Sequence, residues 1–207
     1  MFFVVEPGRD PDARRTRCVS VGVKRLLLFC SLAFVLVSPA LAADDVLVRA
    51  QRRGERIEVQ ARALVAAPLA VVWETLTDYE KLPRFIPGIA KSVVVLRQGN
   101  RLLLEQAGAA RFLFFSFPIE VRLEVIESPQ QSVLSSAVAG NVRRMNGRYD
   151  LEPDATRGAV LLRYSGDIEP DFDLPPLIGV AALRAMAEEQ FTAMVAEIER
   201  RAAAKNE

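Results

Sequence analysis

Short connections between runs of alternating apolar and polar residues most constrain the fold of this chain. In residues 57–65, apolar side chains occupy every second position, which is the period of a half-buried strand. Further β-rich runs follow at 91–98, 101–107, 112–127, 132–138, 142–152 and 159–169. The connections between them are too short for the crossovers that parallel strands need, so the pattern predicts an antiparallel sheet.

Two helices are predicted at either end of this run of strands. Pro68 suits the first turn of a short helix, whose apolar face includes Trp73. A longer helix is predicted over 176–201, and Gln190 interrupts its apolar stripe. The stripe consists of Val180, Leu183, Ala187, Phe191, Met194 and Ile198. The order of strand, helix, several strands and helix predicts an α+β domain.

Glycine-containing connections mark the predicted turns. Gly99-Asn100 separates two apolar runs, which indicates a tight β-hairpin. Asn146-Gly147 also fits a hairpin turn by the local rule, and choosing it would split the strand at 142–152. Further turns are expected at 108–110, 128–130, 139–141 and 153–158.

The first 42 residues are predicted to be an N-terminal extension and a cleaved signal peptide. Lys24 and Arg25 precede an uncharged apolar run at 26–37, and the small-residue triplet Ala40-Leu41-Ala42 follows it. An uncleaved membrane anchor is the alternative, because the uncharged stretch is close to the length that spans a bilayer. Cleavage is favoured, so the mature protein is expected in the periplasm or secreted, beginning at Ala43.

Composition excludes several kinds of chemistry from the mature chain. The protein has no histidine, and both cysteines, Cys18 and Cys30, lie in the predicted signal segment. Catalytic triads with histidine, Cys-His pairs and histidine-ligated metal sites are therefore excluded. Asp171 and Asp173 lack the glycine and closing glutamate of a calcium loop, and no phosphate-binding glycine motif is present. We predict no catalytic residue, metal or cofactor, and the scattered basic residues disfavour nucleic-acid binding.

Three segments, 67–92, 146–153 and 168–176, together resemble the START-like (SRPBCC) domains, and within them the polyketide cyclase/dehydrase and coenzyme-Q-binding group. The resemblance implies a helix-grip fold, in which a curved antiparallel sheet of about six to seven strands wraps a long C-terminal helix. It also implies an elongated apolar cavity between sheet and helix. In the family, the glycine matching Gly147 lies inside a strand, so 142–152 is kept as one strand.

The predicted organisation therefore has three parts. Residues 1–42 are the extension and signal peptide, 43–56 form an N-terminal strand or linker, and 57–207 form the START-like domain. Nothing in the sequence specifies an oligomeric state.

Aromatic, thioether and amide side chains are the candidate ligand contacts. The charged stretch 76–88 is interpreted as a rim of the cavity rather than as an active site, because no charged pair in it has a geometry that the sequence specifies. The candidates on this rim and on the helices are Trp73, Tyr79, Phe85, Leu183, Met186, Gln190 and Met194. For Trp73, core packing is the favoured alternative, and for Gln190 it is a hydrogen bond to backbone.

Candidates on the sheet complete this set. Tyr149 and Tyr164 lie on the apolar parity of their strands, where a buried hydroxyl needs a partner. Phe114 and Phe117 belong to the run 111–118, which is apolar on both strand faces. Ordinary burial of both faces is favoured there, and transient membrane contact during ligand exchange is the alternative.

The favoured function is a periplasmic carrier or binding protein for a hydrophobic small molecule such as a lipid, isoprenoid or quinone. Such a role needs only a dry cavity and a polar anchor. An aromatase/cyclase-type enzyme that works through tyrosine, arginine and bound water is the alternative. A protein-interaction module is the expected function if no cavity exists.

Overall fold

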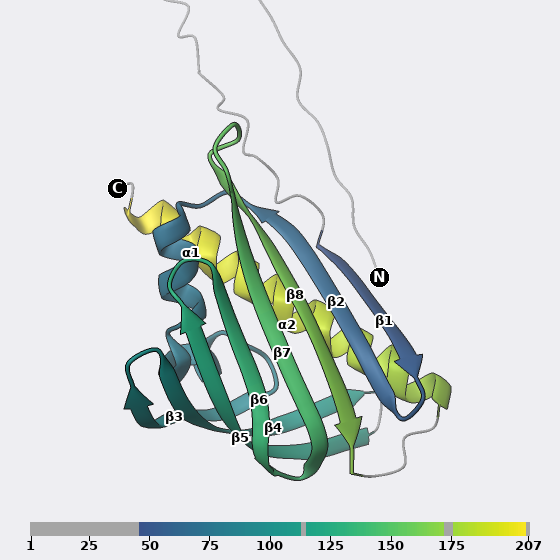
Figure 1. Cartoon of the computed structure of the whole chain (residues 1–207). Coiled ribbons are helices and arrows are strands. Elements are labelled where there is room, and N and C mark those ends of the chain that lie inside the picture. Colours follow the sequence, from purple (N-terminus) through teal and green to yellow (C-terminus); the bar gives the residue numbers. More distant parts are fainter. Residues whose placement is uncertain (1–45, 113–114, 172–175, 206–207) are drawn as a thin grey trace, which may run out of the picture. The chain divides into compact units, whose positions relative to one another are not determined.

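An eight-stranded antiparallel sheet, with strand order β1-β2-β8-β7-β6-β5-β4-β3, forms most of the molecule (Figure 1). The computed structural model describes residues 46–112, 115–171 and 176–205, which lie in one compact unit. The strands are β1 (Leu47–Arg53), β2 (Arg56–Val65), β3 (Ile89–Gln98), β4 (Arg101–Phe112), β5 (Phe115–Ser128), β6 (Ser132–Gly140), β7 (Val142–Asp154) and β8 (Ala159–Pro170). The helices are α1 (Leu69–Leu76), the short 3₁₀ helix η1 (Tyr79–Arg84) and α2 (Pro176–Lys205).

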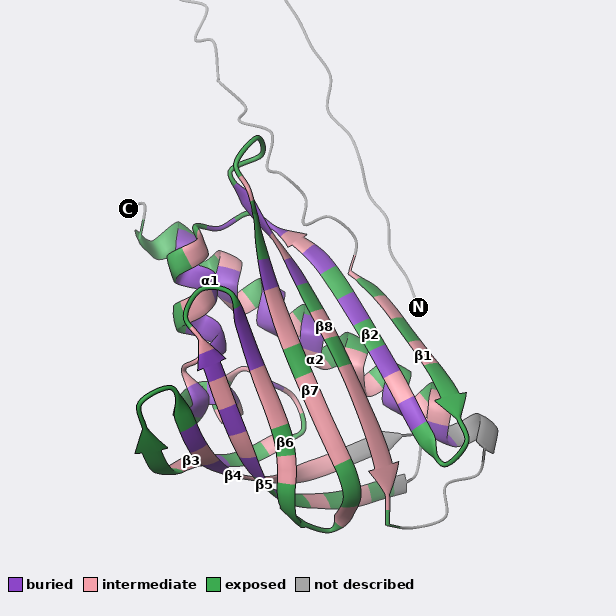
Figure 2. Ribbon diagram, viewed as in Figure 1, coloured by how far each residue is buried: buried purple, intermediate pink, exposed green. Residues whose placement is uncertain are grey.

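Alternation along the strands gives the sheet one dry face. In β2, Ile57, Val59 and Ala61 are buried, whereas Gln60 and Arg62 between and beside them are exposed. Figure 2 shows this change from buried to exposed along the strand. Because successive side chains of a strand point to opposite faces, the apolar set of each strand faces the same side.

The long helix α2 crosses the dry face of the sheet, and the sheet curves around it (Figure 1). Phe191, Val195 and Ile198 of α2 are buried in the core that the sheet and α1 share. The spacing of three and four residues keeps these side chains on one side of the helix. On α1, the buried Thr75 hydroxyl donates to the Val71 carbonyl oxygen at 2.8 Å, so α1 packs without an unpaired hydroxyl.

The predicted α+β helix-grip architecture is confirmed, with one strand more than the expected six to seven. β1 lies in the stretch 43–56, which was expected to form a strand or a linker, and it pairs with β2 around a turn where Gly54 has φ +64°. In the described residues the sheet therefore includes this N-terminal strand. Gly99-Asn100 forms the predicted hairpin between β3 and β4, and β7 runs through Asn146-Gly147 without interruption.

The turn predicted at 108–110 is wrong. β4 continues to Phe112 and pairs with β5 throughout, with Gly108 opposite Ile119. The glycine serves a close approach between chain segments instead of a turn. A Cβ on Gly108 would overlap the carbonyl oxygen of Gly88, which accepts a hydrogen bond from the amide of Ala109 at 2.9 Å. The absent side chain thus lets β4 lie against the segment that leads into β3.

Candidate ligand-binding site

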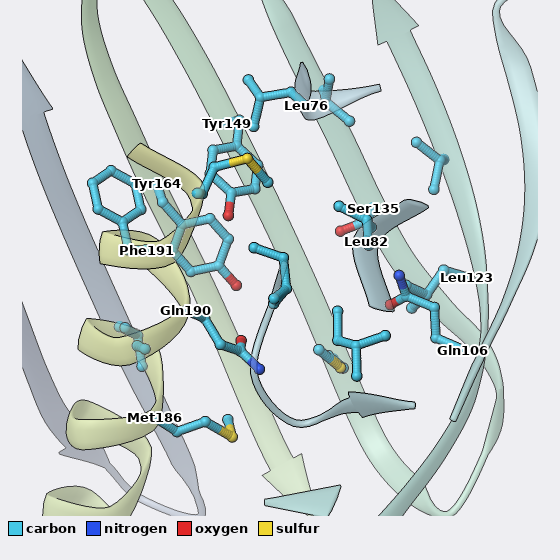
Figure 3. A pocket seen from close by; sticks show the side chains of 18 of the residues that line it. Leu76, Leu82, Gln106, Leu123, Ser135, Tyr149, Tyr164, Met186, Gln190 and Phe191 are labelled. Carbon is cyan, nitrogen blue, oxygen red and sulfur yellow. The ribbon is translucent and has the colours of Figure 1, made fainter. Parts of the chain in front are cut away.

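A cavity of about 210 Å³ lies between the dry face of the sheet, η1 and α2. Most of its lining is aliphatic or aromatic, as Figure 3 shows. The predicted ligand contacts that lie on it are Tyr79, Tyr149, Tyr164, Leu183, Met186, Gln190 and Met194. The fold thus brings together residues from η1, β7, β8 and α2. That each of them binds a ligand stays a prediction.

Two of the candidate ligand contacts, Trp73 and Phe85, do not line the cavity, which for Trp73 agrees with the favoured interpretation of core packing. Both are half-buried and pack against the hydrophobic core. On α1 the position that reaches the cavity is Leu76, almost one turn after Trp73. The ring of Phe85 lies under the guanidinium of Arg201, 5.3 Å from its centroid, which is a cation–π contact at the C-terminal part of α2.

Phe114 and Phe117, in the apolar run at 111–118, were both candidate ligand contacts. Phe117, on β5, is half-buried and does not line the cavity. Phe114 lies outside the described residues. Ser116 and Pro118 on either side of Phe117 are exposed, so burial of both strand faces does not extend to this part of β5.

Two tyrosines form the aromatic centre of the cavity. The rings of Tyr149 and Tyr164 lie 4.9 Å apart at 46°, and Tyr149 also stacks on Phe191 of α2 at 6.4 Å. Burial raises the pKa of both phenols, that of Tyr164 to about 12, with the charge of Asp167 as the second cause for Tyr164. Both therefore stay protonated at neutral pH. Neither hydroxyl forms a hydrogen bond with another of the described residues, so both can donate to a ligand.

Paired glycines on β7 and β8 make room for the ring of Tyr164. Gly147 lies opposite Gly166 in the sheet. A Cβ on Gly166 would lie 2.4 Å from Tyr164 Oη and 2.9 Å from the backbone oxygen of Asn146. A Cβ on Gly147 would lie 3.3 Å from Tyr164 Oη and 2.9 Å from Ser135 Oγ. The two missing side chains thus set where the Tyr164 hydroxyl lies.

Gln190 ties α2 to the segment that precedes β3. Its Nε2 donates to the carbonyl oxygen of Pro87 at 2.9 Å, a contact between residues 103 positions apart. This bond agrees with the favoured alternative for Gln190, which was a hydrogen bond to backbone. A groove of about 590 Å³ adjoins the cavity on this side and shares Ile89 and Met186 with it. Gln190 therefore lies where the cavity meets the surface.

Tyr79 contributes its ring to the cavity, while its hydroxyl is held by the protein. The hydroxyl donates to Glu127 Oε1 at 3.0 Å, and Arg97 Nη1 donates to Glu127 Oε2 at 2.9 Å. Burial, followed by the charge and the hydrogen bond of Glu127, raises the Tyr79 pKa. This cluster anchors η1 to β5 and β3. Leu76, Tyr79, Leu82 and Ile86 of the charged stretch at 76–88 line the cavity, so this stretch forms part of the cavity wall.

Three polar lining residues were not predicted from the sequence: Gln106, Ser135 and Asp167. Gln106 donates to Ser92 Oγ at 3.2 Å, and Ser135 Oγ donates to the Gly147 carbonyl oxygen at 3.4 Å. A detectable signal existed for Gln106, which follows Leu102 and Leu104 on the apolar parity of β4. Asp167 has outward parity and gave no such signal.

Asp167 accepts hydrogen bonds from two neighbours on β7. Arg144 Nε donates to Oδ2 at 3.0 Å, and Asn146 Nδ2 donates to Oδ1 at 3.1 Å.

Among the described residues, no group of three or more histidine, cysteine or acidic side chains could hold a metal ion. Within the same ranges, no helix is long and apolar enough to cross a membrane.

A family model described as polyketide cyclase / dehydrase and lipid transport matches residues 65–195. The chain belongs to this family. The match spans the cavity-forming elements from the end of β2 to the middle of α2, and it confirms the resemblance to START-like domains. No curated protein matches the chain in sequence.

Solved structures share the fold at low sequence identity. A STAR-related lipid transfer protein fragment from Xanthomonas axonopodis has a TM-score of 0.61 at 14% identity, covering 76% of this chain and 97% of that one. The Zhui aromatase/cyclase from Streptomyces sp. R1128 has a TM-score of 0.59 at 17% identity, covering 70% and 95%. A START superfamily protein from Mycobacterium smegmatis has a TM-score of 0.59 at 15% identity, covering 69% and 97%.

Proposed function

We propose that this protein is an exported binding protein or carrier for a hydrophobic small molecule, which it holds in the cavity between the sheet and α2. The observation that carries the proposal is the cavity itself, with its apolar walls and the two tyrosine hydroxyls, Tyr149 and Tyr164. An apolar pocket with a few convergent polar groups is the usual form of a small-molecule site. The family's description, which includes lipid transport, supports the same role.

The size of the cavity limits the part of a ligand that it can enclose. Its volume of about 210 Å³ is below the ~300–1,000 Å³ of sites for drug-sized ligands. A small ring system, or one segment of a longer lipid, isoprenoid or quinone, is therefore the expected guest. The rest of a longer molecule would lie in the adjoining groove beside Ile89 and Met186.

Binding of an uncharged fluorescent probe, N-phenyl-1-naphthylamine, tests this proposal. The probe should bind saturably, with emission that rises as it enters apolar surroundings. Ala187→Phe should abolish that binding, because Ala187 lies on the cavity lining and the larger side chain fills the space. Ala185→Phe is the matched control on the exposed side of the same helix and should bind as the parent does. Equal binding by both variants would refute the cavity as the site.

Export rests on the signal-like segment at the N-terminus. N-terminal sequencing of protein recovered from the periplasm should begin at Ala43. A membrane-bound form that retains residues 26–37 would refute cleavage and make the protein an anchored domain.

An aromatase/cyclase-type enzyme is the competing proposal. Incubation of the protein with its extracted ligand distinguishes the two, because a carrier returns the ligand unchanged and an enzyme converts it. Conversion that stops when Tyr149 or Tyr164 is replaced by Phe would favour the enzyme.

A further inference from the structure

The charge of the cavity lining restricts its ligands further. Asp167 is the only formally charged side chain at neutral pH among the described residues that line the cavity, and no lysine or arginine of the described chain lines it. Two guanidinium groups that pair with acidic residues at the cavity wall are about half exposed: Arg144 pairs with Asp167, and Arg97 pairs with Glu127. An anion in the cavity would thus meet a carboxylate and no unpaired cation.

Resting on the proposed function, we infer that the cavity selects an uncharged apolar ligand that carries an oxygen acceptor, such as a carbonyl, for the hydroxyls of Tyr149 and Tyr164. Free fatty acids and other small anions are excluded from it. Neutral ketones, quinones and esters fit both conditions.

Exclusion of anions follows from the cost of burying an unpaired charge. A carboxylate that leaves water must recover its hydration from a cation or from several donors, and otherwise it binds poorly. The carboxylate of Asp167 adds repulsion. It is held by Arg144 and Asn146, so its charge is neutralised in part on the outer side of the sheet and not within the cavity.

Preference for an oxygen acceptor follows from the two phenols. Their rings pack against each other, the ring of Tyr149 also stacks on Phe191, and the Tyr164 hydroxyl lies in the space left by Gly147 and Gly166. Neither hydroxyl oxygen is among the side-chain atoms that are buried without a partner, so both are reached from the cavity, and an acceptor on the ligand that takes one of these hydrogen bonds in apolar surroundings gains affinity. Burial keeps both groups protonated, and hence able to donate, across the neutral range.

Three naphthalenes of matched shape test both parts of the inference. The probes are 2-acetonaphthone with a carbonyl, 2-isopropenylnaphthalene with a methylene in its place, and 2-naphthoate with a carboxylate. Displacement of N-phenyl-1-naphthylamine from the exported form of the protein gives each affinity. The ketone should bind about three- to tenfold more tightly than the methylene analogue, as one buried hydrogen bond allows. The naphthoate should bind about a hundredfold more weakly than the ketone, or worse.

Two variants assign these preferences to the residues named. Tyr149→Phe combined with Tyr164→Phe should remove the preference for the ketone and leave the rejection of naphthoate unchanged. Met186→Lys places a cation on the lining and should raise naphthoate affinity, while a thermal unfolding scan confirms that the variant is folded.

Each outcome decides a separate statement. Naphthoate that binds as tightly as the ketone overturns the exclusion of anions and leaves the binding role intact. Equal affinity for ketone and methylene analogue overturns the role of the tyrosines. Failure of every probe, including N-phenyl-1-naphthylamine, overturns the proposed function and this inference with it.

Discussion

Gly166 should be intolerant of a side chain because Tyr164 occupies the space that a Cβ would need. In Gly166→Ala the new Cβ would lie 2.4 Å from Tyr164 Oη and 2.9 Å from the Asn146 backbone oxygen, both closer than normal contacts. Such overpacking costs about 1–3 kcal/mol. Replacement of a strand glycine by alanine regains ~0.5–1 kcal/mol through the lower entropy of the unfolded chain, so a net loss of about 0.5–2 kcal/mol is expected.

A double-mutant cycle separates this clash from a general effect on β8. In a Tyr164→Phe background the 2.4 Å contact no longer exists, and Cζ at 2.9 Å is the nearest remaining ring atom. Gly166→Ala should therefore cost less there, with a coupling energy of at least ~0.5 kcal/mol. Urea unfolding followed by circular dichroism measures all four proteins. Ser165→Ala, on the exposed face of the same strand, is the control and should change stability by less than ~0.5 kcal/mol.

An equal cost of Gly166→Ala with Phe and with Tyr at position 164 would contradict a clash with the Tyr164 hydroxyl. That result would mean that the glycine serves the backbone of β8 alone. Tyr164 would then not be positioned by the absent side chain.

Three further predictions concern the core, the contact between α2 and the segment before β3, and acid stability. Trp73 packs half-buried against the core, so its fluorescence emission should be blue-shifted. Trp73→Ala should lower the unfolding free energy by about 3 kcal/mol. Emission typical of a water-exposed indole would contradict this packing. Gln190→Leu removes the 2.9 Å hydrogen bond to the Pro87 carbonyl and should lower the unfolding free energy by ~1 kcal/mol. Amide hydrogen exchange near residue 89 should become faster, and unchanged exchange would contradict a stabilising role for this contact. Hydrogen bonding from Arg200 lowers the pKa of Glu197 from 4.5 to about 2, so its stabilisation is complete above pH 4.5 and disappears as the pH falls toward 2. Glu197→Gln should accordingly show a smaller loss of stability over that interval, which urea unfolding at each pH would measure.

Much of the fold was predictable because a half-buried strand repeats every two residues. The alternation in β2 and the Gly99-Asn100 turn are local signals, and both were read correctly. Gly108 was misread because a glycine in sequence looks the same whether it makes a turn or admits another segment. Only the approach of Gly88, which is distant in the sequence, distinguishes the two cases.

The candidate site was predictable where one parity or one helix face decides burial. That rule found Tyr149, Tyr164 and the methionines of α2. It could not separate Trp73 from Leu76, since both belong to the apolar face of α1 and the position of the cavity is set by tertiary packing. Asp167 was missed because its parity is outward. It borders the cavity and also a groove on the outer face of the sheet. The paired glycines Gly147 and Gly166 lie beside it, and without their side chains the cavity and the groove are not separated there.

The most direct measurement is native mass spectrometry of the protein purified gently from the cells that produce it, followed by organic extraction. Returning a bound apolar molecule to water costs about 25 cal/mol per Å² of apolar surface, so a guest of this cavity should survive purification. We expect an added mass on the protein of up to one molecule per chain, released by solvent as an uncharged oxygen-containing apolar compound and absent from Ala187→Phe. A bare protein mass, or an extract that is the same for the parent and Ala187→Phe, would contradict the claim that the cavity holds a hydrophobic ligand.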